Sequence, residues 1–229
     1  MNDKERVARH AVSRVKDGMR IGLGTGSTAN YFIEALAQRC QQEKLDVVAV
    51  ASSVVSAIKA RQLGLPLMAV EQVTRLDLYI DGADEVAPDL TLLKGRGYDL
   101  VREKLLARAA MNFFVLVDDS KLVGHIGERF PVPVEVMPFA WQMVKQSLED
   151  LGATAELRQN AVGDGLAITT YGSLVLDAVF AQEIDSRTLD THLNAIPGVI
   201  EHGIFQNLAS AVFIGADDQV VERWSDATE

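Results

Sequence analysis

An alternation between short apolar runs and stretches with helical periodicity limits the fold of the first half of this chain most strongly. Short runs rich in branched side chains and bounded by polar turns are typical of buried strands. Such an alternation favours a parallel sheet with helices on both faces, and ligands of that architecture bind beyond the carboxyl ends of the strands. We expect strands at 20–23, 46–51, 66–70, 76–80 and 112–117 and helices at 29–42, 54–63 and 98–110.

The pattern changes at residues 130–138, where three prolines interrupt an alternating run. The elements expected after it follow the order β-α-β-β-α-β of a ferredoxin-like unit. An apolar run at 211–215 is expected to return to the first sheet. The sequence therefore predicts an α/β fold, with a Rossmann-like domain of residues 1–130 plus 206–229 and an inserted small α+β domain of residues 131–205. In the small domain we expect strands at 132–136, 155–159, 167–171 and 199–205 and helices at 139–151 and 186–195.

Composition excludes several classes of partner. The 22 basic and 32 acidic residues give a formal charge of −10, and no basic run marks a nucleic-acid surface. No apolar stretch approaches the roughly 20 residues that span a bilayer, and the N-terminus lacks the apolar segment of a signal peptide. The single cysteine, Cys40, cannot form a disulfide within the chain, which suits a reducing compartment. We expect a cytoplasmic protein with no nucleic-acid or membrane partner.

The segment Gly-Leu-Gly-Thr-Gly-Ser-Thr-Ala at 22–29 follows the first strand and opens a helix. Glycine backbone, a helix N-terminus and hydroxyl groups together suit a phosphate. The segment also matches a dinucleotide-binding pattern, but that pattern requires an acidic residue at the end of the second strand, where Ser52 and Ser53 stand. A monophosphate is therefore favoured over a dinucleotide, and a tight turn capped by Ser27 is the alternative without a ligand.

Three carboxylates, Asp81, Asp84 and Glu85, follow the strand at 76–80, with Gly82 and Ala83 between the first two. Like charges raise carboxyl pKa values, which suits acid–base chemistry, and such a cluster also binds sugar hydroxyls. Two carboxylates with phosphate oxygens would also bind Mg²⁺. The third alternative is a solvated turn in which Asp84 caps the next helix.

A second loop, Lys94-Gly95-Arg96-Gly97, combines a cation with flexible backbone donors and is able to hold an oxyanion. In the helix after it, Val101, Leu105 and Ala109 form an apolar stripe. Glu103 lies about 200° from Val101 at 100° per residue and is expected to point into solvent. Lys121 follows the strand at 112–117, where it could reach an anion or simply belong to a turn.

Taken together, these segments resemble ribose-5-phosphate isomerase, type A. The motifs that carry the resemblance are GTGSTA, Ser52-Ser53, DGADEV, KGRG followed six residues later by Glu103-Lys104, Asp118-x-Ser120-Lys121, and the PVPVEVMP and NAIPGV segments of the small domain. Their order covers essentially the whole chain. The resemblance implies interconversion of ribose 5-phosphate and ribulose 5-phosphate through an enediolate, without a cofactor or metal, in a homodimer or a tetramer.

The resemblance also implies residue roles. Glu103 is the expected base for carbon-bound protons, Asp81 assists ring opening, Lys94 stabilises the enediolate and Asp84 orients hydroxyls. The expected substrate contacts are Thr25, Gly26, Ser27, Thr28, Asp81, Gly82, Ala83, Asp84, Lys94, Gly95, Arg96, Gly97 and Lys121, with Lys4 as a phosphate ligand on the first helix. The chain departs from the family pattern at Arg96 and at Tyr98-Asp99. A sugar-phosphate sensor is the competing class, since related folds serve as binding modules.

Overall fold

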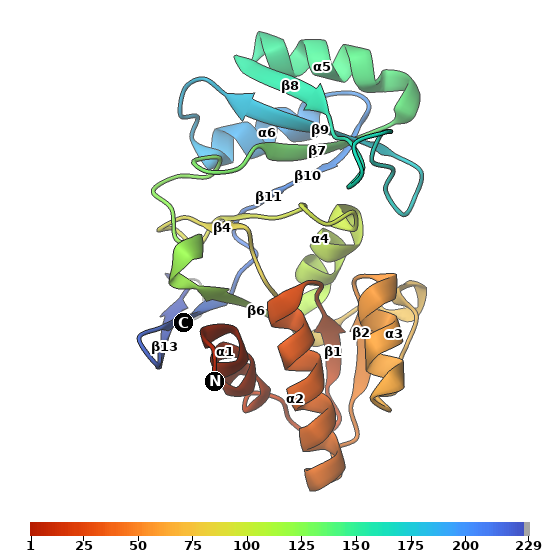
Figure 1. Ribbon diagram of the computed structural model, residues 1–229, viewed down its shortest axis with the longest axis vertical. Helices are drawn as coiled ribbons and strands as arrows, with labels where there is room; N and C mark the ends of the chain where they lie inside the picture. Colours follow the sequence, from red (N-terminus) through yellow and green to blue (C-terminus); the bar gives the residue numbers. More distant parts are fainter. Residues whose placement is uncertain (227–229) are drawn as a thin grey trace. The chain divides into compact units, whose positions relative to one another are not determined.

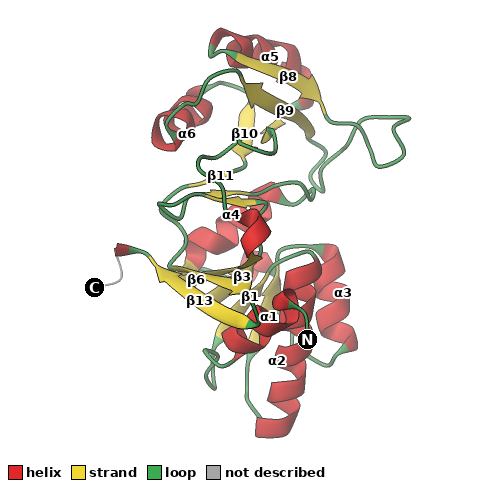
Figure 2. Ribbon diagram, turned by 60° about the vertical axis from the view of Figure 1, so that its left-hand side comes forward, coloured by secondary structure: helices red, strands yellow, loops and turns green. Residues whose placement is uncertain are grey.

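The structure is a computed structural model that describes residues 1–226 (Figures 1 and 2). The chain forms two compact units. The first consists of Met1–Ala83, Arg102–Lys121 and Asn207–Glu229, and the second of Asp84–Val101 and Leu122–Gln206. The second unit thus takes in 84–101 and 122–130, which the sequence-based boundaries place in the Rossmann-like domain. Those domain boundaries stay a prediction.

The first unit contains a six-stranded sheet in the order β13-β12-β6-β3-β1-β2. Its strands pair in parallel except for β13, which is antiparallel to β12. The expected α/β fold with a parallel central sheet is therefore confirmed. The strands are β1 (Arg20–Leu23), β2 (Val48–Ala51), β3 (Leu76–Asp81), β6 (Ala110–Asp118), β12 (Ala211–Ala216) and β13 (Gln219–Trp224).

The strand order fixes where a ligand would bind in this sheet. The chain passes from β1 outward to β2 and then returns to the other side of β1 to form β3. This reversal is a topological switch point, and ligands of doubly wound sheets bind outside the carboxyl ends of the two strands that flank it. The turn at 24–26 follows β1 and Asp81 ends β3, so both lie at this point.

Helices α1 (Asp3–Val12) and α2 (Ser27–Glu43) lie side by side and pack on one face of the sheet (Figure 1). Because side chains alternate along a strand, Leu78 and Ile80 of β3 join this core, whereas Tyr79 and Asp81 point to the opposite face. Helix α3 (Val54–Gln62) packs against β2 and α2. The fourth helix, α4 (Leu100–Ala109), precedes β6.

The second unit contains a four-stranded antiparallel sheet in the order β10-β7-β9-β8. With its two helices this is the β-α-β-β-α-β arrangement that the sequence predicts. The elements are β7 (Val132–Val136), α5 (Trp141–Asp150), β8 (Ala153–Leu157), β9 (Leu174–Phe180), α6 (Ser186–Ala195) and β10 (Val199–His202). Valine, leucine and alanine side chains from both helices and the sheet form its core.

A second, three-stranded sheet of the same unit pairs β4 (Glu85–Val86), β5 (Leu92–Leu93) and β11 (Ile204–Phe205). Asp84 thus leads into a strand, so the alternative in which it caps a helix is wrong. Three short 3₁₀ helices complete the fold: η1 (Val70–Gln72), η2 (Asp119–Lys121) and η3 (Pro138–Ala140).

Two expected strands are absent among the described residues. At 66–70, pairing is limited to hydrogen bonds with Ala49, because Pro66 has no N–H to donate and the chain turns into η1. At 167–171, only isolated bridges form, and Gly172, with a φ of 82°, reverses the chain. The strand of this hairpin is β9, which the sequence analysis did not anticipate.

Candidate active site

The turn after β1 presents backbone donors at the start of α2. Gly26 stands at the N-cap with a φ of 101°, a left-handed conformation that favours glycine. Because glycine has no side chain, it cannot cap the first N–H groups of α2, and these groups together with the helix dipole suit an anion. Ser27 is exposed and Thr28 is half-buried at the same point. The expected phosphate loop therefore has the geometry of an anion site.

Asp81 is fully buried and is held at both carboxylate oxygens. Oδ1 accepts hydrogen bonds from the N–H groups of Thr25 at 3.1 Å and Gly82 at 2.8 Å. Oδ2 accepts the hydroxyl proton of Tyr79 at 2.6 Å. The loop after β1 and the end of β3 are thus joined through one carboxylate, as the switch-point topology requires.

A cluster of hydroxyl groups, which the sequence analysis did not assign to the site, supports this loop. The Thr25 hydroxyl lies 2.9 Å from Ser52 Oγ, 2.7 Å from Ser53 Oγ and 3.3 Å from Ser56 Oγ. Ser56 also donates to the carbonyl of Gly24 at 2.6 Å, and Ser53 caps α3. The available signal was that Ser52 and Ser53 follow β2 at the same edge of the sheet as Thr25.

Glu103 is buried, with 5% of its surface exposed, so the expectation of a solvated side chain is wrong. Leu105, which was expected in the core, is 56% exposed. The buried face of α4 instead comprises Leu100, Glu103, Lys104, Leu106 and Ala107. The apolar stripe predicted the wrong buried face, because two charged residues of this helix, Glu103 and Lys104, are buried.

The negative charge of Glu103 acts on the face of the sheet that carries Asp81. Burial raises the pKa of Tyr79 well above its usual value, and the charges of Asp81 and Glu103 raise it further. Glu103 is therefore within electrostatic range of the Tyr79 hydroxyl that contacts Asp81. Two buried carboxylates, one from β3 and one from α4, thus both raise the pKa of a single phenol of the first unit.

Two lysines of the first unit belong to the expected substrate contacts, and Lys4 among them is the expected phosphate ligand. Lys4 Nζ on α1 donates to Ser27 Oγ at 3.1 Å, so the structure brings Lys4 to the phosphate loop. Lys121 is half-buried at the end of η2, where Ser120 donates its backbone N–H and its hydroxyl to Asp118 Oδ1. The turn interpretation thus describes its backbone correctly.

In the second unit, Asp84 and the lysine loop lie together. The Asp84 N–H donates to the carbonyl of Leu93 at 2.8 Å, and the Arg96 N–H lies 3.4 Å from Asp84 Oδ2. The Arg96 guanidinium stacks on the Phe130 ring with 4.2 Å between its Cζ and the ring centroid. Arg96 is therefore fixed by an aromatic ring, a contact that the sequence did not indicate.

The first half of the lysine loop is buried and its second half is exposed. Lys94 is buried, and its Nζ lies 5.7 Å from the centroid of Phe205. Gly95 has a φ of 101°, and its carbonyl accepts a 2.7 Å hydrogen bond from Arg158, which also forms a salt bridge with Asp177. Arg158 was not among the predicted residues. Gly97 is exposed.

Glu85, the third acidic residue of the cluster, has a different environment. It is fully buried, and its carboxylate accepts hydrogen bonds from the N–H groups of Gly127, Arg129 and Phe130 at 2.7 to 2.9 Å. Backbone donors of residues 127–130 therefore stabilise the Glu85 carboxylate. Among the described residues, no group of three or more histidine, cysteine or acidic side chains is placed to hold a metal ion.

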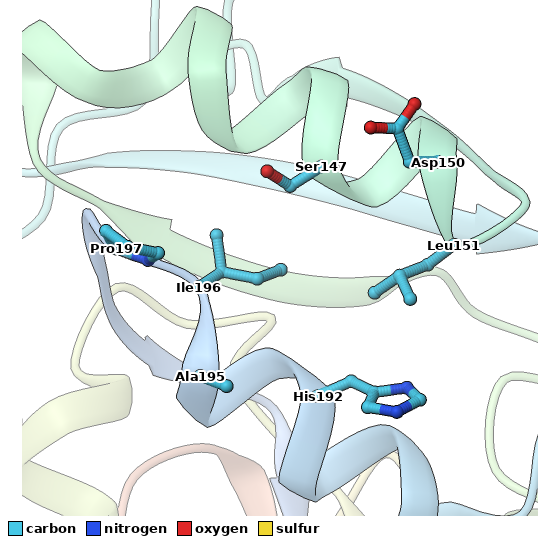
Figure 3. Close-up of a pocket in the computed structure, with 7 residues that line it drawn as sticks. All are labelled: Ser147, Asp150, Leu151, His192, Ala195, Ile196 and Pro197. Carbon is cyan, nitrogen blue, oxygen red and sulfur yellow. The ribbon is translucent and has the colours of Figure 1, made fainter.

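A cavity of about 300 Å³ lies between α5 and α6 of the second unit (Figure 3). Leu151, Ile196 and Pro197 supply apolar walls, and His192 lines one side. None of the predicted site residues lines it. Within the described part of the chain, no helix is long and apolar enough to cross a membrane.

The fold and the polar residues at the switch point define an α/β protein with the ligand-binding edge of a doubly wound parallel sheet. The family model for ribose 5-phosphate isomerase A, or phosphoriboisomerase A, matches residues 48–219. The chain belongs to this family. The ribose-5-phosphate isomerase A of Thermomicrobium roseum is 46% identical over 215 residues, which cover 93% of this chain and 90% of the relative. That of Thermococcus kodakarensis is 43% identical over 95% of both.

Solved structures agree with this assignment. Ribose 5-phosphate isomerase A from Methanocaldococcus jannaschii is 40% identical and superposes with a TM-score of 0.92 over 97% of this chain and 98% of that one. A D-ribose-5-phosphate isomerase in complex with phospho-erythronic acid is 39% identical, with a TM-score of 0.93 over 98% and 100% of the two chains. The expected family and fold class are thus confirmed.

Proposed function

We propose that this protein is an aldose–ketose isomerase that interconverts D-ribose 5-phosphate and D-ribulose 5-phosphate through an enediolate, in the non-oxidative branch of the pentose phosphate pathway. Family membership supports the reaction. The observation that carries the proposal is that two buried carboxylates, Asp81 and Glu103, act on the same Tyr79 phenol at the switch point of the sheet.

The phosphate of the substrate is proposed to bind at the start of α2. The N–H groups of Gly26, Ser27 and Thr28, which follow Thr25 in the loop, are proposed to supply donors, and Lys4 supplies a positive charge beside Ser27. Lys121 is proposed as a second cationic contact. Phospho-erythronic acid, which is bound in a structure of one relative, is a sugar acid phosphate and fits the same requirement for an anion site.

Ring opening and proton transfer are assigned to two different carboxylates. Asp81 is proposed to move a proton between the ring oxygen and O1 of the furanose, with Gly82 and Ala83 beside it in the same turn. Glu103 is proposed to take the C2 proton and return it to C1. Positioned acid–base groups contribute about 100- to 10,000-fold to such steps.

Further roles are proposed for the lysine loop and for Asp84. Lys94 and the amides of Gly95 and Gly97 would stabilise the enediolate oxygen, which is worth roughly 3 to 4 kcal/mol for each well-placed donor. Asp84 would orient substrate hydroxyls, and Arg96 is proposed as a further substrate contact. The salt bridge of Arg158 with Asp177, together with its hydrogen bond to Gly95, supports the preorganisation of this loop.

The proposal is tested by incubating the protein with ribose 5-phosphate in the presence and absence of EDTA and following ketose formation. Turnover that is insensitive to EDTA is the expected result. Saturable binding without product would instead indicate a sugar-phosphate sensor. Turnover that EDTA abolishes would favour the Mg²⁺ alternative at Asp81 and Asp84.

Two further expectations concern the setting of the enzyme. We propose that the protein is cytoplasmic and forms a homodimer or a tetramer. Light scattering coupled to size-exclusion chromatography gives the assembly mass, for which the chain mass of 24.9 kDa is the unit. A monomer at the working concentration would contradict the assembly proposal and leave the isomerase proposal standing.

A further inference from the structure

Tyr79 is buried at the centre of the first unit, and its hydroxyl contacts the carboxylate to which ring opening is assigned. We propose that Tyr79 is a positioning residue for ring opening, because its hydroxyl fixes the orientation of the Asp81 carboxylate. This inference deepens the proposed function and rests on it. The family resemblance implies no role for Tyr79.

The contacts of Asp81 show how Tyr79 restrains its carboxylate. Oδ1 accepts hydrogen bonds from the backbone N–H groups of Thr25 and Gly82. The Tyr79 hydroxyl donates to the other oxygen, Oδ2, at 2.6 Å. Donors on both oxygens restrain rotation about the bond to the carboxylate, and the Tyr79 hydroxyl is one of these donors.

The phenol of Tyr79 has little freedom to move. Its ring stacks on Phe113 with 4.8 Å between centroids and 24° between planes. On another side lies Gly22, where a Cβ atom would come within 2.5 Å of Tyr79 Cδ2. The Tyr79 ring therefore packs between the backbone of Gly22 and the ring of Phe113. This packing holds the Tyr79 hydroxyl in position beside the Asp81 carboxylate.

The Tyr79 phenol stays protonated, so it can always donate its hydrogen bond to Asp81. Burial, the charge of Asp81 and the charge of Glu103 all raise the pKa of the phenol, and a hydrogen bond with Ser52 offsets this only in part. The hydroxyl therefore keeps its proton at neutral pH. Tyr79 orients Asp81 and is not itself consumed or regenerated in the reaction.

The step that needs this orientation is a double proton transfer. The O1 proton of the furanose passes to Asp81 as the C1–O4 bond breaks and the C1=O1 bond forms, and the carboxyl group returns the proton to O4. The Asp81 carboxylate must therefore be oriented so that it can reach both O1 and O4 of the substrate. Misplacement of a reacting group by about 1 Å costs on the order of 100-fold in rate.

Substrate chemistry separates this step from proton transfer at carbon. Ribose 5-phosphate closes a furanose through O4, but ribulose 5-phosphate cannot, because its 5-oxygen carries the phosphate. Exchange of the C1 hydrogen of ribulose 5-phosphate with D₂O, followed by NMR, therefore requires Glu103 and no ring opening. Turnover of ribose 5-phosphate requires both steps.

The test compares Tyr79→Phe with the wild-type enzyme and with Tyr31→Phe. The second variant removes a hydroxyl that accepts a hydrogen bond from Asn2, the N-cap residue of α1. Tyr79→Phe keeps the ring on Phe113. We expect its kcat on ribose 5-phosphate to fall about 10- to 100-fold, as for loss of a hydrogen bond to a charged group. C1 exchange of ribulose 5-phosphate is expected to stay close to wild type, and Tyr31→Phe to match wild type in both.

The ratio of exchange to turnover, measured on one sample, does not depend on the fraction of molecules that are folded. A ratio that rises in Tyr79→Phe supports the positioning role even if the variant is less stable. An unchanged ratio, or unchanged turnover, overturns it. Absence of turnover and exchange in the wild-type protein would contradict the proposed function itself, which is a different outcome.

Discussion

Gly24 lies directly against the side chain of Asp81. A Cβ atom at Gly24 would come within 2.1 Å of Asp81 Oδ1 and within 2.6 Å of Asp81 Cβ. The backbone at Gly24 is also tied to β3, since its N–H donates to the carbonyl of Ile80 at 2.8 Å. The first glycine of the turn after β1 is therefore needed because Asp81 occupies the space of a side chain.

Replacement of Gly24 by alanine should displace Asp81 or the loop that holds it. We expect kcat to fall about 100-fold, because a shift of about 1 Å at a reacting group has that effect. The free energy of unfolding should fall by about 1 to 3 kcal/mol from overpacking. The control is Gly124→Ala, whose Cβ would meet only the flexible end of Glu128, at 3.2 Å. Equal effects of the two substitutions in urea titration and activity assays would contradict the explanation.

Lys4→Ala should weaken binding of the phosphate without slowing chemistry. Lys4 reaches Ser27 at the start of α2, far along the chain from the proposed acid–base groups. We expect KM for ribose 5-phosphate to rise about tenfold with kcat nearly constant, as for loss of one exposed charged hydrogen bond. Lys16→Ala, an exposed lysine beyond the end of the same helix, is the matched control. A fall in kcat with KM unchanged would remove Lys4 from the phosphate site.

Glu135 predicts a pH dependence of stability in the second unit. Burial raises the pKa of its carboxyl above the usual 4.5, although hydrogen bonds from Thr169 and Ser173 offset part of the effect. The folded protein therefore binds this proton more tightly than the unfolded chain does. The contribution of Glu135 to the free energy of unfolding decreases as pH rises from 4.5 through the raised pKa.

Glu135→Gln removes that titration. We expect the variant to gain stability relative to wild type across this pH window, with the difference constant above it. Urea unfolding at a series of pH values measures the effect, with Glu183→Gln as a control because that carboxylate is mostly exposed. A stability difference between the two proteins that stays constant with pH, or that falls as pH rises, would show that burial does not raise the pKa of Glu135.

Much of the fold follows from local pattern. The bounds of β1, β7 and α6 match the expected ranges 20–23, 132–136 and 186–195 residue for residue. The two strands are short apolar runs, and α6 has a helical pattern that begins after its capping residue, Asp185. The expected strand at 167–171 failed because its apolar residues Ile168 and Tyr171 are exposed in a hairpin, so composition there did not report burial.

Some features of the candidate site could also be predicted from the sequence and others could not. The sequence predicts the turn after β1 and Asp81 correctly as neighbours at one sheet edge, because that relationship depends on topology alone. It cannot predict that Glu103 is buried, since helical periodicity counts a charged residue as solvent-facing. Arg158 was missed because its partner, Gly95, is distant in the chain. Tyr79 was missed because a tyrosine inside an apolar strand is counted as core, although its hydroxyl contacts Asp81 two residues further on.

The central claim is that Glu103 transfers the carbon-bound proton. The most direct test is C1 exchange of ribulose 5-phosphate in D₂O by Glu103→Gln, measured beside turnover of ribose 5-phosphate and thermal unfolding. We expect exchange and turnover to fall together by at least about 100-fold while the protein remains folded. Exchange at the wild-type rate in a folded Glu103→Gln variant would contradict this assignment and assign the proton transfer to another group.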